Sequence, residues 1–311
     1  MLFEYANERV KGIKESFDNA MALAIDAYRD NRIVDLYPTS EVFEIYTSTE
    51  GMSGAKNLAA SEKPPVLSMN DGYSVMVYEQ RFGGGIELLE AEYKREANDV
   101  TTKVDAVLIR KRNHLLIANK QLFLTEMFKF LNYAFVTTYY AAPDAAALCG
   151  THTWNTPGAA TFANNGTAAL SISAIDALDE YGGAFTDSTG QPMPMDFDTI
   201  IVKKGSANAR WAKKIFAEGI SPIAIADINI YEGTKTIIET PYITSANKNY
   251  WFAFASKDPN GNPLKMGIGL YPTLCEPIRE LNEAILTNCT GFWKQSIVNM
   301  PYSWYGSNGT T

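Results

Sequence analysis

The chain has 311 residues, 46% of them hydrophobic and 20% charged, and a net charge of −8. This much apolar material excludes a disordered chain, and the negative charge argues against a protein that grips nucleic acid with its whole surface. Residues 1–10 lack the apolar core of a signal peptide, and no apolar run is long enough to span a bilayer. The cysteines are odd in number and widely spaced, which favours reduced thiols over a disulfide framework: Cys149, Cys275 and Cys289.

Helical spacing predicts a first helix over residues 3–31. Its apolar face consists of Phe3, Val10, Phe17, Met21, Ile25 and Tyr28.

The next segment, residues 41–98, predicts an extended β-arm. A strand at 41–49 leads into a loop at 50–72 that is rich in Gly, Ser, Pro and Asn. A second strand is expected at 73–82, and residues 86–96 are strand-like at first and helical later. Little in this segment could bury itself, so we expect the arm to need a partner surface.

Residues 100–140 are expected to form one long helix. Two apolar rows have helical spacing. They consist of Val104, Leu108, Leu115 and Leu122, and of Phe123, Met127, Phe130 and Ala134. About forty residues would extend roughly 60 Å, against a mean helix of about 11–12 residues. A helix of this length indicates a protein built to assemble.

A small α/β domain is predicted after Pro143 and a loop at 141–166. A helix over 170–181 would begin at Ser171 or Ser173 and end at Gly182-Gly183. A buried strand at 199–203 precedes a helix at 207–217 that Ser206 would cap. Further strands are expected at 224–231, 235–239, 250–255, 265–270 and 284–298.

Motifs that could carry chemistry are weak. Gly83-Gly84-Gly85 lacks the spacing of a nucleotide-binding loop and is interpreted as a bend in the arm. Cys149 and His152 are spaced like half a zinc site, but no second pair follows, so a plain loop is preferred. His114 is expected on a solvated helix face.

Asp196 and Asp198 would place two carboxylates on one face of a strand, as a metal site could require. Pro192 and Pro194 instead favour an exposed turn. No GxSxG nucleophile elbow is present.

The basic cluster Arg110, Lys111 and Arg112 has two interpretations, which the sequence leaves open. It could contact phosphates, or it could be a solvated helix face or a bridge to an acidic neighbour. Lys103 and Lys120 extend the same basic stripe.

Several short motifs, in this order, resemble the major capsid proteins of tailed bacteriophages, which have the HK97-type fold. More narrowly, they resemble the Mu-type major head subunit family. The matching passages are Leu148–Trp154, Asn164-Asn165-Gly166, Leu170–Ala177, Phe197–Val202 and Ser303–Asn308. Trp154 stands where relatives usually have proline, and the closing motif is two residues shorter than theirs.

The resemblance implies an α+β chain with the HK97-type capsid fold: an N-arm, an extended β-hairpin called the E-loop, a P-domain with a long spine helix, and an α/β A-domain. The implied boundaries are 1–40 for the N-arm, 41–98 for the E-loop, 99–142 and 273–300 for the P-domain, and 143–272 and 301–311 for the A-domain.

The resemblance further implies a structural protein, not an enzyme, without catalytic, cofactor or metal residues. It would self-assemble as pentamers and hexamers into an icosahedral shell around double-stranded DNA. Expected partners are a separate scaffold protein, a portal and a decoration protein, with no membrane. The location would be the virion capsid, assembled in the bacterial host cytoplasm. Lys56 and Lys63 lie where some relatives crosslink, but that activity is not carried over.

Two other functions stay open. One is an encapsulin-like nanocompartment shell that holds a cargo enzyme. The other is a soluble α/β enzyme with residues 143–272 as its catalytic domain.

Overall fold

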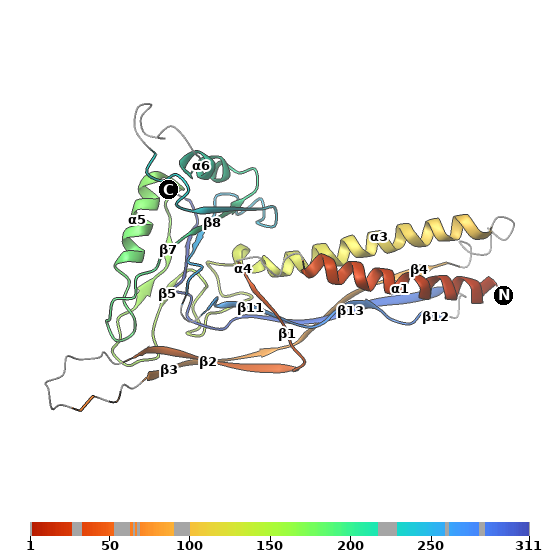
Figure 1. Cartoon of the computed structure of the whole chain (residues 1–311), viewed down its shortest axis with the longest axis horizontal. Helices are drawn as coiled ribbons and strands as arrows, with labels where there is room; N and C mark the ends of the chain where they lie inside the picture. The colour runs from red at the N-terminus through yellow and green to blue at the C-terminus, as the bar shows by residue number, and fades with distance from the viewer. Residues whose placement is uncertain are drawn as a thin grey trace. The chain divides into compact units, whose positions relative to one another are not determined.

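A computed structural model shows two compact units, which we describe separately (Figure 1). Unit 1 comprises Met1–Glu44, Val77–Met127 and Met266–Gln295, and unit 2 comprises Ile45–Met76, Phe128–Lys265 and Ser296–Thr311. The structure describes residues 2–26, 33–52, 63–64, 66, 69–89, 100–216, 229–258, 261–279 and 284–310. Within these ranges no helix combines the length and the apolar character that crossing a bilayer requires.

Two helices of unit 1, α1 (Leu2–Asp26) and α3 (Val100–Met127), lie side by side (Figure 1). On α1, Phe17, Met21 and Ile25 are buried at the spacing of one helical face, which confirms the predicted helix up to Asp26. Residues 27–31 of that prediction lie outside the described residues.

The prediction of one helix from 100 to 140 is wrong about its end, although α3 is long. α3 stops at Met127 after 28 residues, or about 42 Å, and only the single turn α4 (Lys129–Asn132) follows. Tertiary contacts explain the break. The Phe128 ring stacks on Tyr242 with centroids 5.3 Å apart, and Asn132 donates to the Tyr242 carbonyl oxygen at 2.9 Å. A straight continuation of α3 would forgo these contacts, so helical periodicity alone does not decide where the helix ends.

The sheet of unit 1 has the order β1-β11-β13-β12, and β4 also pairs with β13. Its strands are β1 (Asp35–Pro38), β4 (Gln80–Leu88), β11 (Leu264–Leu274), β12 (Ile278–Arg279) and β13 (Ile285–Ile297). The strand predicted at 284–298 is confirmed, and the one predicted at 265–270 continues to Leu274. Trp293 of β13 stacks on Phe82 at 3.8 Å and meets Phe123 of α3 edge-on at 5.7 Å, which fixes the helix on the sheet.

The strand predicted at 73–82 is in fact two strands. β2 (Phe43–Met52) pairs with β3 (Met69–Tyr78), and after Glu79 the chain enters β4. The glycines at 83–85 therefore lie inside a strand and form no bend. Gly83 is required because β13 approaches closely: a Cβ there would lie 2.2 Å from the Cys289 carbonyl oxygen.

Unit 2 contains a mixed sheet of order β7-β14-β10-β8-β9. β8 (Thr199–Lys203) and β9 (Thr236–Thr240) are parallel and are joined through α6 (Ala207–Phe216), as in a βαβ unit. The other strands are β7 (Asn165–Gly166), β10 (Trp251–Phe254) and β14 (Trp304–Ser307). This confirms the small α/β domain and its strands at 199–203, 235–239 and 250–255.

Both predicted helix starts in unit 2 are confirmed. Ser171 caps α5 (Ile172–Gly183) by accepting from the Ala174 N–H at 3.3 Å, and Ser206 accepts from the Ala209 N–H at 3.1 Å. One core joins these helices to the sheet: Ile175 and Leu178 from α5, Ala212 and Ile215 from α6, and Ile200 and Val202 from β8. The two helices therefore cover the same face of the sheet.

Three features of unit 2 differ from the sequence prediction. Residues 229–231 of the strand expected at 224–231 form a turn, with the Tyr231 N–H donating to Asn229 Oδ1 at 3.1 Å. The remainder, 224–228, lies outside the described residues. β14 was not anticipated. The loop at 141–166 also contains the short strands β5 (Thr151–His152) and β6 (Phe162–Ala163), which pair.

Candidate assembly surfaces

The β2–β3 sheet has an exposed apolar face. Phe43 and Ile45 of β2 are 52% and 58% exposed, and Met76 and Tyr78 of β3 are 48% and 62% exposed. Side chains two residues apart on a strand share a face, so this pattern places them on the same side. A hydrogen bond between the hydroxyls of Thr47 and Ser74, 3.0 Å long, continues that side. Each of these four apolar side chains keeps about half of its surface exposed in the structure.

The opposite side of the sheet is more buried and mixes polar with apolar residues, among them Glu50 of β2 and Val77 of β3, which corrects the expectation that the arm buries little of itself. Glu50 is 2% exposed, and its carboxylate accepts from the N–H groups of Asn155 and Thr156 at 2.7 and 2.9 Å. The Thr156 hydroxyl donates to it at 2.9 Å. Asn155 Nδ2 also donates to the Asp71 carbonyl oxygen at 3.2 Å. Within unit 2, Glu50 therefore fastens this part of the sheet to the 155–156 loop. We call this contact the Glu50 anchor.

A buried lysine lies where β2 begins. The Lys294 side chain is 0% exposed and its Nζ is 2.7 Å from Glu44 Oε1, while Glu44 is 20% exposed. Lys294 also donates to the Glu41 carbonyl oxygen at 2.8 Å, and the Tyr37 hydroxyl donates to Glu44 at 2.7 Å. A buried charge must be paired in this way, so the start of β2 is held by unit 1 itself.

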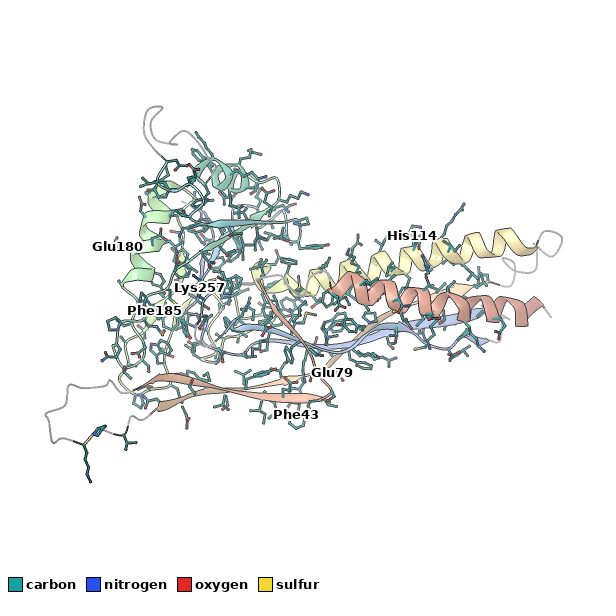
Figure 2. All side chains as sticks on the ribbon, viewed as in Figure 1. Phe43, Glu79, His114, Glu180, Phe185 and Lys257 are labelled. Atoms are coloured by element: carbon teal, nitrogen blue, oxygen red, sulfur yellow. The ribbon has the colours of Figure 1, made fainter. Side chains whose placement is uncertain are left out.

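The three predicted basic residues have different surroundings. Lys111 Nζ donates to the Glu87 carbonyl oxygen at 2.6 Å, and Arg112 donates to the Ser16 hydroxyl on α1 at 2.6 Å. Arg110 is exposed on α3. Only Arg110 is thus fully presented to the surface, while the other two also hold α3 to its neighbours. His114 is exposed as well and lies on the outer side of α3 (Figure 2).

His152 and Asp144 form a buried pair that replaces the half zinc site considered above. His152 Nδ1 lies 3.1 Å from Asp144 Oδ2, with side-chain exposures of 0% and 2%. Burial acts to raise the pKa of the Asp144 carboxyl, but hydrogen bonds from His152 and from the Thr153 and Ala146 N–H groups outweigh it and hold the pKa below its usual value. Cys149 is buried, and burial raises the pKa of its thiol.

Asp196 and Asp198 lie in an extended segment before β8, outside any strand, so the alternative that places both carboxylates on one strand face does not hold. Asp196 is exposed, whereas Asp198 accepts from the Thr199 hydroxyl at 2.7 Å and from the Ser256 hydroxyl. Across the described ranges, no group of three or more His, Cys, Asp or Glu side chains is arranged to hold a metal ion.

Sequence reasoning missed Glu50 and Lys294. A strand that alternates apolar and polar residues normally turns its apolar side inward. In β2 the polar side, with Ser48 and Glu50, is buried and the apolar side is exposed. No sequence signal within the strand distinguishes this inverted arrangement from the usual one.

Comparison with solved structures identifies similar folds. The chain resembles the capsid of Myoviridae phage XM1 with 13% identity and a TM-score of 0.51, over 90% of each chain. It resembles the acid-stable capsid of Helicobacter pylori bacteriophage KHP30 with 8% identity and a TM-score of 0.51, over 88% of this chain and 87% of that one. It resembles the capsid of cyanophage Pam1 with 10% identity and a TM-score of 0.50, over 92% of each chain.

No family model and no curated protein matches the sequence. At such low identity the structural likeness shows the fold alone. The fold is α+β and of the HK97 capsid type, as the sequence predicted.

Proposed function

We propose that this chain is the major capsid protein of a tailed bacteriophage, and that it assembles with copies of itself into an icosahedral shell around double-stranded DNA. The observation that carries the proposal is the exposed apolar face of the β2–β3 sheet. Covering its four half-exposed large side chains would contribute roughly 3–6 kcal/mol per copy, before the cost of association. A neighbouring subunit offers that cover, and symmetry repeats the contact in every copy. The HK97-type fold supports the same conclusion.

The proposal gives each segment a place in the shell. Residues 1–40 serve as the N-arm, 41–98 as the E-loop, 99–142 and 273–300 as the P-domain, and 143–272 and 301–311 as the A-domain. Unit 1 takes in residues 77–89, so the proposed E-loop is divided between the two units. Membership in the Mu-type head subunit family is part of this proposal and rests on the short motifs described above.

The proposed partners follow from the shell. Copies of the chain form pentamers and hexamers, a separate scaffold protein guides closure, and a portal and a decoration protein complete the head. Assembly takes place in the bacterial cytoplasm, and the product is the virion capsid. The role is structural and non-enzymatic.

Imaging of the purified protein tests the proposal. We expect closed shells by negative stain for the wild type, and their loss when Ile45 and Met76 are both replaced by Ser. Ile117→Ser is the matched control, because Ile117 is also about half exposed but lies on α3. A protein that sediments as a folded monomer at all concentrations would contradict the proposal and favour the soluble enzyme. Shells that copurify with one cargo enzyme and no nucleic acid would favour the nanocompartment.

Arg110, Lys111 and Arg112 are proposed to contact DNA or a neighbouring subunit. Replacing all three by Gln would also remove the contacts of Lys111 and Arg112 within unit 1, so Arg110→Gln alone is the informative variant. We expect Arg110→Gln to reduce either shell yield or DNA content. Normal, normally filled particles for both the single and the triple variant would exclude both roles.

A further inference from the structure

The outer face of α6 is basic and carries an exposed tryptophan. The inner residues of α6 belong to the unit 2 core. Four residues on its other side are exposed: Arg210, Trp211, Lys213 and Lys214. Trp211 is 47% exposed, which is unusual for the largest side chain, and the helix contains no acidic residue. We call these four residues the α6 face. Tryptophan and arginine are the residue types enriched at the energetically important centres of protein interfaces, which makes Trp211 and Arg210 the candidates for the centre of a contact.

Part of the α6 face is left without a carboxylate. Lys213 pairs with Glu239 within unit 2. Lys214 Nζ lies over the Trp211 ring, 4.9 Å from its centroid, and Arg210 donates to the Gly205 carbonyl oxygen at 3.3 Å. No described residue forms a salt bridge with Arg210 or Lys214. The stacked indole and ammonium form a preorganised element that an acidic partner could cover.

α5 has the opposite character. All its charged residues are acidic and exposed: Asp176, Asp179 and Glu180. We call these the α5 face. Asp176 accepts from the Tyr231 hydroxyl at 2.7 Å and Asp179 pairs with Lys235 at 2.6 Å, whereas Glu180 forms no salt bridge with any described residue. Figure 2 shows Glu180 on the outer side of α5. Ala177 and Gly183 beside it are exposed and small, which leaves room for an indole ring.

We propose that the α6 face of one copy binds the α5 face of a second copy, so that unit 2 domains link head to tail. Both helices use their inner sides for one shared core, so their outer faces point away from that core. Two different faces in contact make a heterologous interface when each copy uses its two faces on two different neighbours, and such a contact builds a ring where the rotation between copies closes. This inference rests on the proposed function, because it names the contact that would build the pentamers and hexamers.

Charge complementarity favours a second copy over nucleic acid as the occupant. Phosphates would satisfy Arg210 and Lys214, but they would leave the acidic α5 face unexplained and offer no small-residue surface to Trp211. The net charge of −8 also opposes binding of a polyanion.

A charge swap tests the interface. The variants are Lys214→Glu, Glu180→Lys, the double variant and Trp211→Ala. Lys248→Glu is the control, because it makes the same charge change at an exposed loop position of unit 2. All the substituted side chains are exposed, and a thermal midpoint checks that each variant folds. Shell yield is measured by imaging, and self-association by sedimentation velocity.

We expect each single variant on the two faces to reduce self-association at least tenfold, the double variant to recover to within about twofold of wild type, and the control to match wild type. Single variants that self-associate as strongly as wild type would overturn the inference. So would a double variant that self-associates no more strongly than either single variant. A Lys214→Glu protein that forms normal but poorly filled shells would also overturn it and assign the α6 face to nucleic acid. If the wild type forms no shell yet self-associates, and the swap pattern holds, the inference survives while the proposed function fails.

Discussion

The Glu50 anchor gives a quantitative prediction. Glu50→Gln keeps the size of the side chain but removes its charge and replaces one acceptor oxygen with an amide donor. Depending on which oxygen is replaced, that amide would face the N–H group of Asn155 or that of Thr156, and neither N–H can accept a hydrogen bond from it. Each hydrogen bond to a charged group contributes about 1.5–3 kcal/mol, and three bonds to one carboxylate are not additive. We expect the contact to weaken by about 3 kcal/mol.

Hydrogen exchange of the unassembled subunit measures this loss. A change of about 3 kcal/mol corresponds to roughly a hundredfold faster exchange, since about 1.4 kcal/mol is a factor of ten. The acceleration should be confined to residues 48–50, 69–76 and 155–156, while the core strands β8 and β10 keep their protection. Glu41→Gln is the control, because it makes the same change on an exposed side chain. Unchanged exchange at residues 48–50 and 69–76 in Glu50→Gln would refute the claim that this carboxylate fastens this part of the β2–β3 sheet to the 155–156 loop.

Three further predictions concern buried groups. Lys294→Met should destabilise unit 1 by about 2–3 kcal/mol, because it leaves the partly buried Glu44 carboxylate without its cation. Calorimetry measures the shift in the unfolding midpoint. A midpoint equal to that of wild type would show that the Lys294–Glu44 pair does not stabilise the fold. Asp144→Asn should destabilise unit 2 by about 2 kcal/mol at neutral pH. The pKa of Asp144 in the folded protein lies below its unfolded value of 3.8. The stability that its charge contributes is therefore present above pH 3.8 and is lost as the pH falls through the folded pKa. The free energies of unfolding of wild type and Asp144→Asn, measured by urea titration, should converge in acid. At pH 8 a maleimide should label the exposed Cys275 and spare Cys149 and Cys289, since burial raises the pKa of Cys149, and burial, with minor help from nearby charges, raises that of Cys289 to about 12. Equal labelling of all three would contradict the burial.

Local signals account for what the sequence predicted well. Ser171 and Ser206 are capping residues directly before apolar helical patterns, and both caps are present. The strand at 199–203 is a short run of buried β-branched residues, and its bounds agree with the structure. These elements depend on residues close in sequence, so pattern and propensity suffice.

The failures have a common cause in contacts between distant residues. The end of α3 is decided by Tyr242, more than a hundred positions beyond Phe128. The sequence around residues 83–85 predicts a bend, because the strand that pairs with these glycines, β13, lies some two hundred residues further along the chain. The Glu50 anchor likewise depends on the loop at 155–156, and no residue near position 50 in the sequence predicts a contact with that loop.

The position of β14 has a consequence for synthesis of the protein. This strand, residues 304–307, lies between β7 and β10, so it fills the interior of the unit 2 sheet. A ribosome that stops anywhere before Trp304 releases a chain in which the edges of β7 and β10 are both open. Such a product lacks a finished unit 2, so the central strand of this sheet becomes available only when translation has passed residue 307.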